Sequence, residues 1–214
     1  MISTQIKNVE LEFETDPQGF SPHRIDAGTL AMLSVTDFHP GERILDLGCG
    51  YGVVGILAAK LAGQENVILC DISEGAVERA RANARRNQVP ELEIRVSDAF
   101  SAVPERDFAL ILSNPPYHAD FSVPRRFIEE GFKRLAVGGR MVMVTKRLDW
   151  YKNKLTAVFG GVKVYETDGY HVFVAHKRAS TVKKKDKTAG KLSKKLQRKQ
   201  GRKENRKKAM KAAE

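Results

Sequence analysis

The sequence predicts an α/β protein whose core is a doubly wound, mostly parallel sheet of seven strands that ends in an antiparallel hairpin. The first observation is that short apolar runs alternate with segments whose apolar residues recur at helical spacing. The second is a turn signal, Thr167-Asp168-Gly169, which separates the last two runs and predicts the hairpin. The third is a basic segment without aromatic residues at 177–214, which predicts a disordered tail.

The expected elements follow one another in a regular order. A separate N-terminal strand is expected over Val9–Glu14, where apolar and polar residues alternate. The strands of the sheet are expected at Arg43–Leu47, Val67–Asp71, Leu92–Val96, Phe108–Ser113, Met141–Thr145, Val162–Glu166 and His171–Ala175. The helices between them are expected at Gly52–Leu61, Ser73–Asn87, Pro124–Leu135 and Trp150–Phe159.

Local signals support several of these bounds. Ser73 is a favourable N-cap for the helix that follows it. The near-continuous apolar run Phe108–Ser113 is typical of a central parallel strand that is buried on both faces. The pair Gly138-Gly139 is expected to stop the preceding helix.

Charge divides the chain into a folded part, 1–176, and a tail, 177–214. The formal net charge is +11, and the tail holds 17 Lys/Arg against 3 Asp/Glu, which gives +14 and leaves −3 for the rest. Such a tail is typical of a polyanion-binding arm, which gains affinity for RNA by releasing counterions from phosphates. A solubilising role and binding to anionic lipid are the alternatives.

Other observations exclude whole classes of protein. We expect no membrane span, because no apolar run approaches the ~18–20 residues that cross a bilayer. The N-terminus has no secretory signal pattern, which favours a cytoplasmic protein. Cys49 and Cys70 lack metal-site spacing, so we expect no metal, and we expect both thiols to be small buried groups.

A glycine-rich loop, Asp46-Leu47-Gly48-Cys49-Gly50-Tyr51-Gly52, follows the first strand of the sheet and opens a helix. One interpretation is a dinucleotide-binding fingerprint, because Gly50, Gly52 and Gly55 have its spacing and Asp71 follows. The alternative interpretation rests on Asp46, which lies at the end of the strand, and on the three glycines that follow it at every second position, Gly48, Gly50 and Gly52. In that pattern the chain resembles the Rossmann-like class I methyltransferases that use S-adenosylmethionine.

This resemblance implies a cofactor site along one edge of the sheet. It implies that Asp46 lies near the amino end of the cofactor, that Asp71 accepts hydrogen bonds from both ribose hydroxyls, and that Asp98 accepts from the adenine amine. Open α/β sheets bind ligands at the carboxyl ends of their strands, where all three acids are expected. The cofactor-binding residues so implied are Asp26, Asp46, Gly48, Gly50, Gly52, Asp71, Ile72, Asp98, Ala99, Phe100 and Asn114.

A second motif, Asn114-Pro115-Pro116-Tyr117, follows the fourth strand of the sheet. It resembles the motif of methyltransferases that act on planar nitrogens, and it implies that these residues form the catalytic site. The Asn114 side-chain carbonyl and the Pro115 main-chain carbonyl would accept the two hydrogens of the amine and align it with the methyl donor. Tyr117 would stack on the flat substrate, and His118 is either a proton acceptor or a structural residue.

The segments Phe20-Ser21 and Asp26-Ala27-Gly28-Thr29 narrow the resemblance further. From about Thr15 to Lys177 the chain is similar to the small-domain methyltransferases, which include bacterial 16S rRNA guanine-N2 methyltransferases. Residues 1–30 are then expected to cover cofactor and substrate. Those rRNA enzymes commonly carry a further N-terminal domain, and we expect the basic tail to take over part of its RNA-holding role.

Guanine N2 in rRNA is therefore the first expectation for the methylated group. The alternatives are adenine N6 in RNA, an amine of adenine or cytosine in DNA, and the side-chain nitrogen (N5) of a protein glutamine. A non-enzymatic RNA-binding protein and a nicotinamide-dependent dehydrogenase are also kept open. A base within a duplex would have to be flipped out to reach Tyr117.

Overall fold

The computed structural model describes residues 1–15, 24–115 and 120–179. The strands are β1 (Ile2–Ile6), β2 (Val9–Phe13), β3 (Ile44–Leu47), β4 (Val67–Asp71), β5 (Glu93–Val96), β6 (Phe108–Ser113), β7 (Leu135–Thr145), β8 (Lys163–Thr167) and β9 (Tyr170–His176). The helices are α1 (Ala27–Ser34), α2 (Val53–Ala62), α3 (Glu74–Arg86), α4 (Ser122–Arg134) and α5 (Leu148–Phe159), with a short 3₁₀ turn at Gln64–Asn66.

The seven strands β3 to β9 form one sheet in the order β5-β4-β3-β6-β7-β9-β8. The pairs from β5 to β7 are parallel, and β9 pairs antiparallel with both β7 and β8. This confirms the predicted doubly wound sheet with its C-terminal hairpin. The strand order reverses between β3 and β6, and such a switch point is where open α/β sheets bind ligands.

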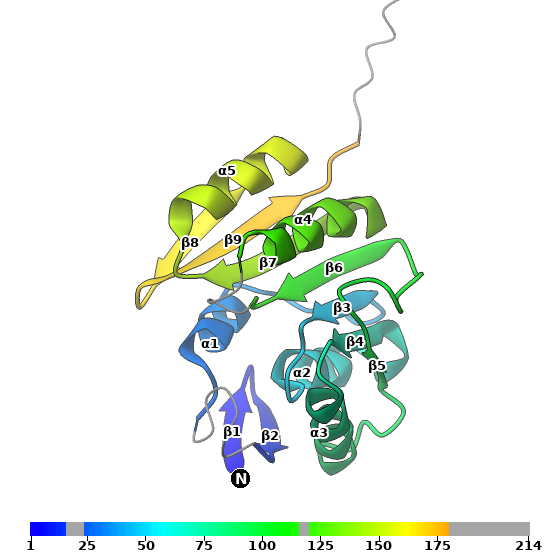
Figure 1. The fold of residues 1–214 in the computed structure, drawn as a ribbon. Coiled ribbons are helices and arrows are strands. Elements are labelled where there is room, and N and C mark those ends of the chain that lie inside the picture. Colours follow the sequence, from blue (N-terminus) through cyan, green and yellow to red (C-terminus); the bar gives the residue numbers. More distant parts are fainter. Residues whose placement is uncertain (16–23, 116–119, 180–214) are drawn as a thin grey trace, which may run out of the picture. The chain divides into compact units, whose positions relative to one another are not determined.

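Helices cover both faces of this sheet (Figure 1). Side chains alternate along each strand, so Ile44 packs with α1, α2 and α3 on one face, whereas Leu45 packs with α4 and α5 on the other. The two hydrophobic clusters hold the strand ends in fixed positions. Within the described residues, no helix is long and apolar enough to cross a membrane.

The N-terminal strand belongs to a hairpin that the sequence did not predict. β1 and β2 pair antiparallel from Ile2 opposite Phe13 to Ile6 opposite Val9. Lys7 and Asn8 form the turn with φ of 51° and 63°, as a type I′ turn requires at both central positions. The usual Asn-Gly or Asp-Gly signal is absent, which explains why the sequence did not reveal the turn.

Two further differences concern α1 and β7. Helix α1 was not expected, because its residues are almost uniformly apolar and show no helical stripe. Gly138-Gly139 lies within β7 and does not end the helix, since α4 already stops at Arg134. A Cβ atom on Gly139 would lie 2.7 Å from the carbonyl oxygen of Phe108, so the close approach of β7 to β6, where their pairing register shifts, requires glycine.

The compact unit of the chain runs from Met1 to Ala179. Lys177 belongs to this unit, because its main chain pairs with Gly138 and Gly139 of β7 and its ammonium donates to the carbonyl of Leu135. The expected boundary at 176/177 therefore lies a few residues before the end of the compact unit. The rest of the expected basic tail, 180–214, lies outside the described residues.

Candidate functional site

The predicted site residues gather at the carboxyl edge of the parallel strands. Asp46 lies in β3, Asp71 ends β4, Asp98 follows β5 and Asn114 follows β6. Because these strands are parallel neighbours, their ends lie side by side. The glycine-rich loop connects β3 to α2 at the same edge.

Hydrogen bonds to the neighbouring strand β4 fix the glycine-rich loop. The N–H groups of Gly48 and Cys49 donate to the carbonyl of Cys70 at 2.9 and 3.0 Å, and the N–H of Gly50 donates to Asp71 at 2.9 Å. The φ angles of Gly48, Gly50 and Gly52 are 79°, 54° and 97°, which favour glycine at each position. A Cβ on Gly50 would meet nothing within 4 Å, so this part of the loop faces open space.

Asp46 joins β3 to the first turn of α2. Its side chain is 3% exposed, and its Oδ2 accepts a hydrogen bond from the N–H of Gly55 at 2.8 Å. Desolvation raises the pKa of Asp46 to about 7, the negative charge of Asp71 adds to this rise, and the Gly55 N–H opposes it. This carboxyl can therefore gain or lose a proton near neutral pH.

Asp71 is oriented but keeps room for a ligand. Its Oδ1 accepts from the N–H of Ser73 at 3.0 Å, and its Oδ2 accepts from Gly50. Each carboxylate oxygen can accept a second hydrogen bond, and the residue is partly exposed. The neighbouring Ile72 is 70% exposed, which puts an apolar surface beside this carboxylate.

The loop between β5 and β6 carries Asp98, Ala99 and Phe100. Arg126 of α4 donates to the Asp98 carboxylate at 2.7 Å and to its carbonyl at 3.2 Å. Asp98 itself is exposed. The side chain of Phe100 is 2% exposed and packs inward, with the Arg134 guanidinium 5.0 Å from its ring centre, so Phe100 offers a ligand its main chain only.

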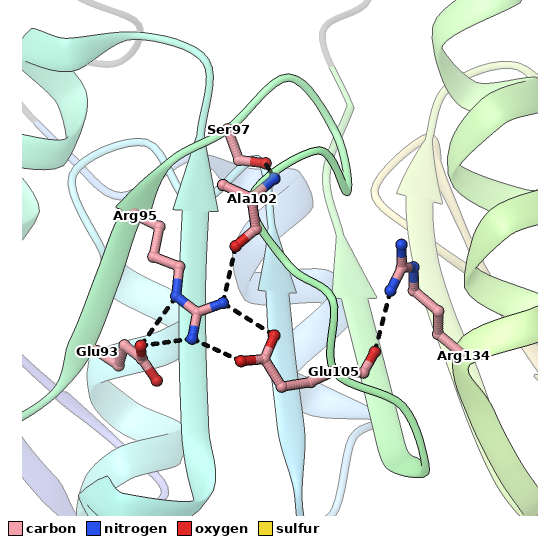
Figure 2. A network of polar contacts seen from close by, with 6 residues as sticks. All are labelled: Glu93, Arg95, Ser97, Ala102, Glu105 and Arg134. Atoms are coloured by element: carbon pink, nitrogen blue, oxygen red, sulfur yellow. Dashed lines mark hydrogen bonds and ion pairs between the residues drawn. The ribbon is translucent and has the colours of Figure 1, made fainter.

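An arginine-centred network holds the rest of this loop (Figure 2). Arg95 of β5 donates to the carboxylates of Glu93 and Glu105 and, at 2.8 Å, to the carbonyl of Ala102. The hydrogen bonds from Arg95 lower the pKa of Glu105, so that carboxyl stays ionised. Arg134 donates to the Glu105 carbonyl at 3.1 Å, which ties the loop to α4 as well.

Asn114 is the residue with the most distinctive environment. Its Nδ2 donates to the Asp26 carboxylate at 2.8 Å and to the Thr29 hydroxyl at 3.1 Å. A carboxylate only accepts hydrogen bonds, so Asp26 fixes which end of the Asn114 amide faces it. The opposite atom, Oδ1, is buried and has no hydrogen-bond partner among the described residues. An unpaired buried carbonyl is costly, and it is a ready acceptor for a donor that enters the site.

Asp26 was expected to contact the cofactor. Within the protein, its carboxylate binds the first turn of α1 and the side chain of Asn114. It is the N-cap of α1, since its carboxylate accepts from the Thr29 N–H at 2.9 Å. Pro115 is buried beside Asn114. Pro116, Tyr117, His118, Phe20 and Ser21 lie outside the described residues, so their expected roles stay predictions.

Sequence reasoning missed two residues that support the site. Arg126 had no signal, because an arginine on a helix is ordinarily a solvated side chain. Asn83 did have a signal in the sequence. It lies on the same buried face of α3 as Ala80 and Ala84, where a polar side chain needs a buried hydrogen-bond partner.

Comparisons with known proteins agree with this geometry. The sequence profile of the methyltransferase small domain matches residues 10–174. The chain is 34% identical to a ribosomal RNA small subunit methyltransferase C of Serratia proteamaculans, over 82% of this chain and 52% of that protein. It therefore spans about half the length of that relative. It is also 31% identical to the uncharacterized protein YbxB of Bacillus subtilis, over 82% of this chain and 90% of that protein.

A solved structure of a methyltransferase is also similar to this chain. The 16S rRNA N2 G1207 methyltransferase RsmC of T. thermophilus, determined in complex with AdoMet and guanosine, superimposes with a TM-score of 0.74. The two sequences are 26% identical, and the match covers 83% of this chain and 50% of that chain.

Proposed function

This chain belongs to the methyltransferase small domain family, and from that premise we propose that it methylates an exocyclic base amine in RNA. S-adenosylmethionine is the methyl donor, and guanine N2 of ribosomal RNA is the proposed acceptor. Relatives and a structural neighbour that carry the names of small subunit rRNA methyltransferases support this choice. A ribosomal RNA substrate also favours a cytoplasmic location.

The observation that carries the proposal is that the buried Oδ1 of Asn114 has no hydrogen-bond partner in the part of the chain that the structure describes. An amine conjugated to a base is a poor nucleophile, because its lone pair is delocalised into the ring. Asn114 Oδ1 and the carbonyl of Pro115 accept its two hydrogens, which turns the lone pair out of the ring plane and toward the methyl donor. Asp26 and Thr29 keep the amide in place, so the acceptor is oriented before the substrate arrives.

The residues at the other strand ends fit the proposed cofactor. S-adenosylmethionine supplies a methyl group on a positively charged sulfur when it is bound. Asp71 has an acceptor position left on each oxygen for the two ribose hydroxyls. Asp98 receives the adenine amine, Ile72 covers the ring, and the loop at Gly48, Gly50 and Gly52 lies against the methionine part. Tyr117 stacks on the target base.

Methyl transfer to separated substrate classes tests this function. The full chain is incubated with labelled S-adenosylmethionine and rRNA, tRNA, DNA or protein from cells that lack this protein, and the products are identified by mass spectrometry. Label in N2-methylguanosine of rRNA is expected. Label in methyladenosine, in DNA or in methylglutamine would move the proposal to that substrate. No label in any fraction, with S-adenosylhomocysteine bound in calorimetry, would contradict the proposed transfer to free RNA.

The tail at 180–214 is proposed to hold the RNA. It contains 15 Lys/Arg and 3 Asp/Glu. Removing 180–214, which leaves Lys177 in place, is expected to lower RNA affinity and to reduce the slope of log affinity against log salt by ~0.7 for each lost contact to a single strand. An unchanged slope would assign the phosphate contacts to the compact unit.

A further inference from the structure

Two buried asparagines, Asn83 in α3 and Asn87 at the C-cap of that helix, bind the N-terminal hairpin in place of a neighbouring strand. Asn83 is 0% exposed and Asn87 is 5% exposed. Asn83 accepts from the Glu14 N–H at 2.8 Å and donates to the Glu14 carbonyl at 3.0 Å. Asn87 makes the same pair of bonds with Glu12, at 3.0 and 2.7 Å.

The spacing of the two elements explains this match. Four residues of helix rise about 6 Å, and two residues of strand rise about 6.8 Å. Amides at positions i and i+4 of α3 therefore meet alternate residues along the free edge of β2. The two asparagines are equivalent in their contacts with the hairpin, and both lie in the same buried layer.

They differ in their third hydrogen bond. Asn83 Nδ2 also donates to the carbonyl of Tyr51, at 3.0 Å, near the end of the glycine-rich loop. Asn87 Nδ2 instead donates to the carbonyl of Asn83 at 2.8 Å, which keeps its third bond within α3. Of these two asparagines, Asn83 alone therefore joins the hairpin to the loop.

The loop needs such an anchor on this side. Gly50 and Gly52 flank Tyr51, and both have positive φ, so the main chain around Tyr51 has little conformational restriction of its own. The carbonyl of Cys70 and the carboxylate of Asp71 hold the loop from β4. Asn83 holds it from α3, and through Glu14 it connects the loop to the hairpin.

The side chain of Tyr51 continues the same connection. Its ring meets the ring of Phe13 in β2 edge-on, with centres 5.8 Å apart. Burial, and then the negative charge of Asp26, raise the pKa of Tyr51 to about 12. Tyr51 is thus close enough to Asp26, the residue that orients Asn114, for the two to interact electrostatically.

We propose that Asn83 is a positioning residue of the cofactor site, which fixes the glycine-rich loop against the N-terminal hairpin through the Tyr51 carbonyl. The inference rests on the proposed function, because it takes this loop as the cofactor loop. Asn83 touches no substrate atom in this role. It acts by holding the main chain of Gly50 to Gly52 in the conformation that receives the methionine part.

Asn87 gives the experiment its matched control. Asn83→Ala and Asn87→Ala each delete one pair of bonds to the hairpin, so both are expected to lower the thermal midpoint of the full chain by similar amounts. Only Asn83→Ala also frees the Tyr51 carbonyl. Its Kd for S-adenosylhomocysteine in calorimetry is expected to rise about fivefold to tenfold, as for the loss of one hydrogen bond, and that of Asn87→Ala less than twofold.

Two further readouts separate positioning from general destabilisation. Hydrogen exchange of the Gly50 and Gly52 amides in the ligand-free protein is expected to accelerate in Asn83→Ala but not in Asn87→Ala. In methyl-transfer assays the KM for S-adenosylmethionine is expected to rise while the KM for RNA stays unchanged. If the alanine variants do not fold, Asn83→Ser and Asn87→Ser, which keep a hydroxyl in the buried layer, form the second matched pair.

The outcomes decide between the two roles. Equal losses of affinity in the two variants, or equal exchange in the loop, would overturn the proposal and leave Asn83 with a structural role only. If the unmodified chain does not bind S-adenosylhomocysteine, the proposed function fails instead. The exchange of the loop amides then still decides whether Asn83 fixes the loop.

Discussion

The carboxyl edge of the sheet has two halves that are prepared for ligands in different ways. In the half formed by β3, β4 and β5, each acid already has a partner: Asp46 binds Gly55, Asp71 binds Gly50 and Ser73, and Asp98 binds Arg126. In the half that begins with β6, Asn114 is held at one end only, and its buried Oδ1 is left without a partner among the described residues.

This difference indicates which half lowers the stability of the protein before a ligand binds. The acids of the first half are oriented by main-chain N–H groups and an arginine, and they accept a ligand through lone pairs that remain free. The second half keeps an unsatisfied carbonyl, whose desolvation costs about 1–3 kcal/mol until a donor arrives. The first half is therefore a preformed binding surface, whereas the second is completed by the substrate.

Asn114→Ala is the change expected to have the largest effect. It removes the acceptor for the substrate amine, so single-turnover methyl transfer is expected to slow by ~10²–10³-fold, as when one preorganised polar group is lost from an active site. The Kd for S-adenosylhomocysteine is expected to change less than twofold. The free energy of unfolding should change little, because the variant loses the bonds to Asp26 and Thr29 together with the orphaned carbonyl. Turnover at the original rate would contradict the role of Oδ1.

Asp71→Ala tests the first half, and here we expect a change in cofactor affinity instead of a change in the rate of transfer. It removes both oriented carboxylate oxygens. A hydrogen bond to a charged group contributes about 1.5–3 kcal/mol, so the loss of even one ribose contact is expected to raise the Kd for S-adenosylhomocysteine at least ~10-fold. Single-turnover transfer at saturating S-adenosylmethionine should stay within a few-fold of the original rate. Calorimetry gives the affinity, and an unchanged Kd would argue against the ribose contact.

Asp26→Asn probes the link that orients the second half. Asparagine is as good an N-cap as aspartate, so α1 should keep its stability. An amide can donate as well as accept, however, so Asn114 is no longer forced to present Oδ1 to the substrate. A tenfold decrease in kcat, on the order of one hydrogen bond, is expected with an unchanged KM for S-adenosylmethionine. A variant with normal kcat would show that Thr29 alone fixes the amide.

The sequence predicted the sheet well because its strands carry clear signals. Buried runs such as Phe108–Ser113 predicted the doubly wound, mostly parallel sheet, and the turn Thr167-Asp168-Gly169 predicted the hairpin, both as the structure has them. It failed where local patterns are weak: the turn at Lys7 and Asn8 has no glycine, and Gly139 allows β7 to approach β6 closely instead of ending a helix.

The site could be predicted as a set of residues but not as a set of partners. That Asp46, Asp71, Asp98 and Asn114 share one edge follows from their places at successive strand ends. That Asp26 binds Asn114, 88 positions away, depends on how α1 packs against the sheet. No spacing in the sequence contains that information, and the same holds for Arg126 on Asp98.

Asp46→Asn tests stability instead of turnover, and it concerns the one buried acid of the first half. The folded protein binds the Asp46 proton more tightly than the unfolded chain does, because burial raises the pKa of this carboxyl from 3.8 to about 7. Its contribution to the free energy of unfolding therefore decreases as the pH rises from about 4 to about 7, by up to ~1.4 kcal/mol per pH unit. Above pH 7 this contribution levels off.

Urea unfolding of both proteins between pH 5 and pH 8 measures this contribution. Asparagine cannot titrate, so the stability of Asp46→Asn relative to the original protein is expected to increase from pH 5 to pH 7 and then stay constant. Asp149→Asn, at an exposed position on α5, is the control for loss of one carboxylate. Parallel curves for the original protein and Asp46→Asn would mean that the Gly55 N–H alone offsets the burial of the charge. Asp46 would then stay ionised at no cost in stability, and the contrast between the halves would become larger.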